Sequence, residues 1–238
     1  MRYEMAPLAI ESAQSERAAF IRRTYAHLAG AILAFVALEV AFFTTIVPAL
    51  GLETALRSYV MSPWLQLVVL LAFIVVGYVA RSWAMNGSSQ AMQYAGLGLF
   101  VVFEAVIFIP ILFIANIYDG GTGLIYGQAG VLTLSLFGAL TAVVFLTGKD
   151  FSFLRSILII GSFLMLGTCI AAIFIGFSLG LLFSVVGIAL ASGFILYDTS
   201  NVMLHFRTDQ HVAAALDLFA SVAYLFFHIL RILILTRN

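Results

Sequence analysis

Long runs of apolar residues divide this chain into seven segments, each long enough to cross a lipid bilayer. The runs cover approximately residues 27–49, 64–83, 92–116, 123–146, 154–176, 178–200 and 213–234. A helix of about 20 apolar residues spans the hydrocarbon core. Because the runs are continuous, they lack the alternation that is typical of strands in outer-membrane barrels. The pattern therefore predicts an all-α membrane protein with seven transmembrane helices.

The division between the fifth and sixth runs depends on the short segment IGFSLGL. Within it, Gly176 and Gly180 can supply a tight turn, so we expect the two helices to form a hairpin. The other connections are too short to hold a second domain. We expect residues 1–22 to form an amino-terminal arm and residues 23–238 to form one transmembrane domain.

The last run differs from the others because polar side chains recur along it. They are separated by four, three, four and three residues, and they are Asp217, Ser221, Tyr224, His228 and Arg231. This spacing places all five on one face of a helix. Charged groups are costly in a bilayer. We therefore expect the last helix to be central, with its polar face lining an interior formed by the other helices.

Two acidic residues interrupt other apolar runs. Glu39 lies in the middle of the first run and is interpreted as a neutral acid bonded to a neighbouring helix or as a functional group. Glu104 precedes Pro110 by six residues. Because proline removes a helical hydrogen bond, a kink is expected near this acid. Glu104 then either lines a cavity or accompanies a purely structural bend.

A third acid, Asp198, stands at the end of the sixth run. The connection 201–212 is short, so Asp198 and Asp217 are expected at neighbouring helix ends. Two carboxylates that share a poorly hydrated site cannot both ionise easily. The pair therefore predicts a proton-sensitive latch, although Asp198 alone could also be a helix-end acid in contact with water.

Composition and charge agree with a membrane protein. Hydrophobic residues make up 63% of the chain and charged residues 9%, whereas soluble domains contain about 25% charged residues. The net charge is zero, so no nucleic-acid surface is expected. Eight of the 11 Lys and Arg residues fall on the amino-terminal side of a seven-span arrangement. By the positive-inside rule, the amino terminus is expected in the cytoplasm and the carboxyl terminus outside.

Enzymatic interpretations fit the sequence poorly. Tyr197 and Asp198 match the Tyr-Asp pair of intramembrane aspartyl proteases, but the Gly-x-Gly-Asp element of those enzymes is replaced by Ala-Leu-Asp at Asp217. Ser192 lacks a Gly-x-Ser context, and the four histidines lack the spacing of a catalytic zinc site. Cys169 is the single cysteine, which excludes a thiolate cluster. We expect no enzymatic activity, no cofactor and no dedicated metal site.

Four segments resemble the transmembrane BAX inhibitor motif family, the Bax inhibitor-1-like proteins. They are FIRRTYAHLAGAILA, LTLSLFGALTAVVFLTGKDFSFL, ILYDTSN and LFFHILRIL, of which TGKDFSFL and LYDTSN are the more specific parts. The resemblance implies seven helices with the last one central. It also implies a pH-dependent leak of calcium ions across the lipid bilayer or, as for bacterial relatives, modulation of a membrane-bound ATP-dependent protease.

In the calcium-leak members of the family, two aspartates on the sixth and seventh helices form the pH sensor. The first corresponds to Asp198 in LYDTSN. When the seventh helices are aligned on their terminal Leu-Arg, the second falls on Ser221, one turn after Asp217. Either Asp217 takes over the role, or the chain belongs to a subgroup without this sensor. Arg81, near the end of the second run, is interpreted as a counter-ion of the pair.

Two hypotheses of different classes follow. The first is a pH-sensitive cation leak channel or transporter, with calcium as the ion, in the inner membrane of a bacterium. The second is a regulatory protein without ion flux, which binds a membrane-bound ATP-dependent protease through its charged arm and its lipid-facing helices. The acidic interior favours the first hypothesis, and the serine at the second sensor position favours the second.

Overall fold

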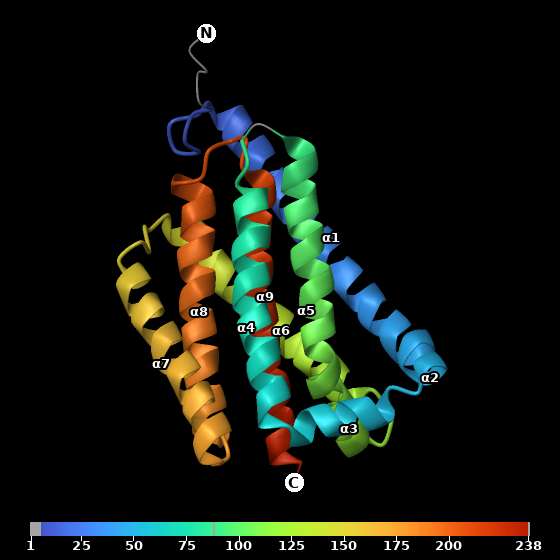
Figure 1. Ribbon diagram of the computed structural model, residues 1–238. Coiled ribbons are helices and arrows are strands. Elements are labelled where there is room, and N and C mark those ends of the chain that lie inside the picture. The colour runs from blue at the N-terminus through green and yellow to red at the C-terminus, as the bar shows by residue number, and fades with distance from the viewer. Residues whose placement is uncertain (1–5, 88, 238) are drawn as a thin grey trace.

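The computed structural model shows long helices lying side by side in a bundle (Figure 1). It describes residues 6–87 and 89–237. The membrane-spanning segments are Gln14–Leu50, α4 (Pro63–Ala84), α5 (Gln90–Asp119), α6 (Leu124–Thr147), α7 (Leu154–Ile175), α8 (Leu181–Leu204) and α9 (His211–Thr236). The first segment comprises α1 (Gln14–Ala41), the π-helical turn η1 (Phe42–Ile46) and α2 (Val47–Leu50), and α3 (Glu53–Met61) follows it. The prediction of an all-α membrane protein with seven spans is confirmed.

The first helix begins earlier than the apolar pattern indicates. It starts at Gln14, whereas the first apolar run begins at about residue 27. No glycine or proline occurs between Gln14 and His27, and Phe20 and Thr24 in this stretch are buried. Tertiary packing therefore stabilises helix through the more polar segment that precedes the apolar run. Residues 1–5 of the expected arm lie outside the described residues.

The break between α7 and α8 lies where the glycines predict it. Gly176 ends α7 with a φ of 81°, in the left-handed region that glycine adopts at little cost. Gly180 precedes α8 in an extended conformation. Only at Gly176 do the backbone angles therefore favour glycine over other residues. The two helices pack against each other, as expected for a hairpin.

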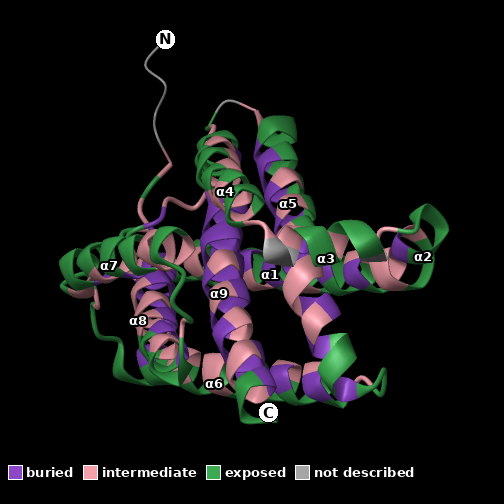
Figure 2. Cartoon of the chain, turned by 60° about the horizontal axis from the view of Figure 1, so that its bottom comes forward, coloured by how far each residue is buried: buried purple, intermediate pink, exposed green. Residues whose placement is uncertain are grey.

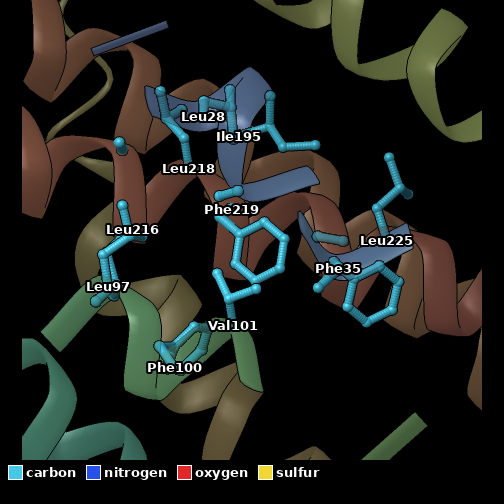
Figure 3. Close-up of a cluster of buried hydrophobic side chains, with 14 of the residues drawn as sticks. Leu28, Phe35, Leu97, Phe100, Val101, Ile195, Leu216, Leu218, Phe219 and Leu225 are labelled. Atoms are coloured by element: carbon cyan, nitrogen blue, oxygen red, sulfur yellow. The ribbon is translucent and has the colours of Figure 1, made fainter. Parts of the chain in front are cut away.

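Helix α9 lies between the other helices and is the most buried of the spans (Figure 2). It packs against α8, α1, α6 and α5. Its first turns contain Ala213, Ala214 and Ala215, all buried, and these small side chains let neighbouring helices approach closely. Further along, the rings of Phe35, Phe100 and Phe219 meet at centroid distances of 6.0 and 6.1 Å. Figure 3 shows this cluster between α1, α5 and α9.

The amino-terminal arm is attached to the connection between α8 and α9. The amide of Ala9 donates to the carbonyl of Phe206 at 2.9 Å, and the amide of Thr208 donates to the carbonyl of Pro7 at 3.1 Å. Ala9 is completely buried. The arm therefore covers the end of the bundle at which α9 begins.

Candidate functional site

Four polar side chains from three helices meet at the end of the bundle where α9 begins. They are Arg81 of α4, Asp198 of α8, and Asp217 and Ser221 of α9, and together they are called the aspartate cluster here. An Arg81 guanidinium nitrogen (Nη1) lies 2.8 Å from Asp217 Oδ1. The hydroxyl of Ser221 donates to Asp198 Oδ2 at 2.5 Å. The structure thus brings together four of the residues that the sequence singled out.

The two carboxylates of the cluster are close enough to interact electrostatically. Asp217 and Ser221 are one turn apart on α9, which places their Cβ atoms about 5–6 Å apart. Ser221 is bonded to Asp198, so Asp198 of α8 lies beside the turn of α9 that carries Asp217. Asp198 consequently experiences the negative charge of Asp217 as well as the positive charge of Arg81. The single arginine offsets a repulsion that would otherwise be costly in a buried site.

The members of the aspartate cluster differ in how far they are buried. The side chain of Asp217 is only 5% exposed, whereas that of Arg81 is 58% exposed. Asp198 and Ser221 are buried as well. The cluster therefore combines an exposed guanidinium with carboxylates that remain buried.

The position of Arg81 is set by a close approach of α4 to α5. Gly96 of α5 packs directly on the backbone of α4, where Ala80 and Ala84 flank the arginine. A Cβ atom at Gly96 would lie 2.6 Å from the backbone nitrogen of Ala84, well inside van der Waals contact. Sequence reasoning missed this glycine. The spacing of Ala80 and Ala84, which forms a small-xxx-small pattern, could have indicated the contact.

The two most specific segments of the family resemblance meet beside the cluster. The amide of Phe151, in the connection after α6, donates to the hydroxyl of Ser200 at 3.1 Å. Asp150 pairs with His205 at 3.4 Å, and the backbone N–H of Ser152 bonds to Asp150 at 2.8 Å. That bond holds the pKa of Asp150 below its usual range. The connection is therefore fixed to the end of α8, two residues after Asp198.

The remaining polar side chains of α9 form a separate group towards its other end. The rings of Tyr224 and His228 are 4.6 Å apart between centroids. His228 is 1% exposed and lies against Gly187 of α8, where a side chain would leave no room for the imidazole. Arg231 donates to the carbonyl of Leu179. Seven residues separate Ser221 from His228, or about 10 Å along the axis, so His228 and Arg231 lie outside the aspartate cluster.

Glu104 lies on the opposite side of α9 from the aspartate cluster. It is buried on α5 between Phe100 and Phe108, one turn from each. The ring of Phe100 packs on Phe219, and that of Phe108 packs on Phe226. By helical periodicity, these phenylalanines of α9 face away from its polar side. The structure therefore does not bring Glu104 to the cluster.

Glu39 is the other acid within an apolar run. Glu39 is 8% exposed, and neither of its carboxylate oxygens has a hydrogen-bond partner among the described residues.

Helix α5 continues through Pro110 to Asp119, so the proline does not end it. Within residues 6–87 and 89–237, no three His, Cys, Asp or Glu side chains lie close enough together to hold a metal ion.

The fold and this site define a multi-pass integral membrane protein with a buried acidic pair at one end of a seven-helix bundle. Comparison with known families agrees with this class. The model of the family described as inhibitor of apoptosis-promoting Bax1 matches residues 17–238. The chain belongs to this family, the Bax inhibitor-1-like membrane proteins.

Similar proteins occur in bacteria, fungi and plants. A BI1-like protein of Arabidopsis thaliana is 39% identical over 125 residues, which are 47% of this chain and 45% of that protein. A membrane protein of Vibrio cholerae is 30% identical over 180 residues, or 74% of this chain and 78% of the relative. Bax inhibitor 1 of Schizosaccharomyces pombe is 27% identical over 232 residues, which are 96% of this chain and 80% of that protein. The likeness to the last two extends over most of the bundle.

Proposed function

We propose that this protein is a pH-sensitive cation leak channel, that calcium is the ion it passes, and that the aspartate cluster is its proton sensor. The observation that carries the proposal is the ion pair between Arg81 of α4 and the buried Asp217 of α9, next to Asp198. It joins two helices through a charge that a proton can remove.

The ion pair ties α4 to α9 when Asp217 is ionised. Apart from this contact, α4 packs mainly on α5. Protonation of Asp217 removes the negative charge that holds the guanidinium, and Arg81, already more than half exposed, moves into solvent. The contact between α4 and α9 is then weakened beside the polar face of α9. Acidic pH opens the path and neutral pH closes it.

The chemistry of the cluster suits a hard cation. Two carboxylates and one hydroxyl supply oxygen ligands, which calcium prefers over nitrogen or sulfur. The cation is the transported substrate, and it occupies the site only in passage. Release of Arg81 also removes the positive charge that would repel it.

Flux measurements in liposomes test the proposal directly. Purified protein reconstituted alone is expected to pass calcium into dye-loaded vesicles several-fold faster at acidic than at neutral pH. Vesicles without protein, measured at both pH values, are the control. Flux no greater than in these vesicles at either pH would contradict a channel.

The exposed charges near the amino terminus favour a second candidate function. Glu11, Glu16, Arg22 and Arg23 are all exposed, on the arm and the first turns of α1. Such a surface suits a regulatory protein that binds a membrane-bound ATP-dependent protease without passing ions. Absence of flux together with copurification of such a protease, lost when these four charges are neutralised, would favour this function over the channel.

The proposed location is the inner membrane of a bacterium, with the amino terminus in the cytoplasm. The start of α1 and the end of α9 lie at opposite ends of the bundle (Figure 1). A reporter enzyme that works only outside the cytoplasm is expected to be active when fused after Asn238, which lies outside the described residues, and inactive when fused after Gly148. Basic residues near Gly148 keep that connection inside. The reverse pattern would invert the orientation.

A further inference from the structure

An open groove runs between α1 and α5 on the outside of the bundle, and its lining shares no residue with the aspartate cluster. Its volume is about 430 Å³. Small and aliphatic side chains make up most of its lining, including Ala26, Gly30 and Ala34 from α1 and Gly98, Val101 and Val102 from α5. Most of these residues are exposed. The groove is therefore apolar and faces the lipid.

The groove has the length of one membrane leaflet. Its lining on α1 extends from Ala26 to Leu38, which corresponds to about 18 Å at the rise of an α-helix. Half of the hydrocarbon core is about 15 Å thick. The apolar runs begin at residues 27 and 92, so the end of the groove at His27 and Tyr94 coincides with the expected membrane interface. The groove thus extends from the interface towards the midplane.

Polar side chains gather only at the interfacial end of the groove. His27 Nδ1 donates to the carbonyl of Arg23 at 2.7 Å, which leaves Nε2 as the acceptor for the Tyr94 hydroxyl at 3.1 Å. The ring of His211, at the first residue of α9, lies 5.0 Å from that of His27 between centroids. His211 is buried, and its Nδ1 lacks a hydrogen-bond partner among the described residues.

The charge at this end is positive. Arg23 is exposed and close enough to His211 to interact electrostatically, and Arg22 is exposed beside it on α1. The carboxylate near His211 is that of Asp209, which pairs with Arg207 at 3.2 Å. An apolar groove with basic groups at its interfacial end complements an amphiphile with a long chain and an anionic head.

We infer that the groove binds one acyl chain of an anionic phospholipid, with the phosphate headgroup lying against Arg23 at the interfacial end of the groove. The inference is independent of the proposed cation flux, because the groove and the aspartate cluster involve different residues. A zwitterionic phospholipid would fill the same groove but gain less from the basic end. Selectivity for the headgroup therefore distinguishes a specific site from ordinary surrounding lipid.

Two substitutions separate the chain-binding part of the groove from its head-binding part. Gly98→Leu places a side chain in the groove, and a Cβ atom there meets nothing within 4 Å, so the helix itself can accept it. Gly138→Leu is the matched control, because Gly138 is an exposed helical glycine of α6 with equally open surroundings. Arg23→Gln removes a headgroup charge and leaves the groove open.

The measurement is native mass spectrometry of purified protein offered equal amounts of phosphatidylglycerol and phosphatidylcholine with identical chains. The natural protein is expected to retain phosphatidylglycerol about five-fold better, the ratio that one basic residue produces at an anionic surface. Gly98→Leu should lose the bound lipid and Gly138→Leu should keep it. Arg23→Gln should keep a lipid but lose the preference.

Three results would overturn the inference. Equal retention of the two lipids by the natural protein would identify ordinary surrounding lipid. Unchanged selective retention by Gly98→Leu, and by Gly30→Leu on the other wall of the groove, would place the lipid elsewhere. A mass that corresponds to two protein chains, lost in Gly98→Leu, would show that the groove receives a second copy of this protein. If Gly98→Leu fails to fold, Gly30→Leu decides alone.

Discussion

Asp217→Asn is expected to abolish the pH dependence of cation flux or to shift its midpoint by at least about one pH unit, the size of effect that a neighbouring charge produces. Asparagine keeps the shape of the side chain but carries no charge at any pH. The link to Arg81 loses its ionic part, so the variant resembles the protonated protein. Flux at neutral pH should approach the flux that the natural protein shows at acidic pH. The liposome assay with a calcium dye measures both quantities.

Asp198→Asn tests the other half of the aspartate cluster. It removes the negative charge beside Asp217 and keeps a side chain that can bond to Ser221. We expect it to change the pH dependence as well. The double variant should add little to either single one, since groups that act as a coupled unit are not additive. Simple addition of the two effects would mean that the acids titrate independently.

Glu104→Gln is the matched control for both substitutions. It also neutralises a buried carboxyl group within a span, but on the side of α9 that faces away from the cluster. The midpoint of the pH dependence is expected to stay unchanged, because no contact joins Glu104 to Arg81 or to the aspartates. If both aspartate variants behave like this control, the sensor hypothesis is wrong. Asp198 would then be a helix-end acid, and the regulatory function would lead.

Gly96→Ala is expected to destabilise the bundle by about 1–3 kcal/mol, the usual cost of extra volume at a tight contact. The added methyl group would overlap the backbone of α4 near Ala80 and Ala84, and backbone atoms cannot turn aside as a flexible side chain can. Helix α4 must move outward, and Arg81 moves with it. We therefore also expect higher flux at neutral pH. Thermal unfolding in detergent and the liposome assay measure the two effects.

Gly98→Ala is the control for this substitution, two residues further along α5. A Cβ atom at Gly98 meets nothing within 4 Å. Alanine is a better helix former than glycine by up to about 1 kcal/mol, so this variant should be as stable as the natural protein or slightly more stable. Equal melting temperatures for Gly96→Ala and Gly98→Ala would mean that α4 and α5 do not approach as closely as the structure places them.

The sequence by itself determined the number of spans, their approximate limits and the class of protein. These properties are local. A run of apolar residues must be helical to cross a bilayer because its backbone polar groups have no water to bond. The spacing of Asp217, Ser221 and Tyr224 likewise fixes the side of α9 on which they lie, whatever surrounds the helix. The turn at Gly176 could be placed for the same reason.

Only the tertiary structure decided which helix each polar side faces. The periodicity of a helix fixes the relative positions of its own side chains but not its rotation against its neighbours. The sequence could not therefore show that Asp217 meets Arg81 while Ser221 meets Asp198, or that Glu104 lies on the other side of α9. It could not place the start of α1 either, because burial of Phe20 continues that helix beyond the apolar run. Each of these contacts depends on residues far apart in the chain, which are joined only when the bundle closes around α9.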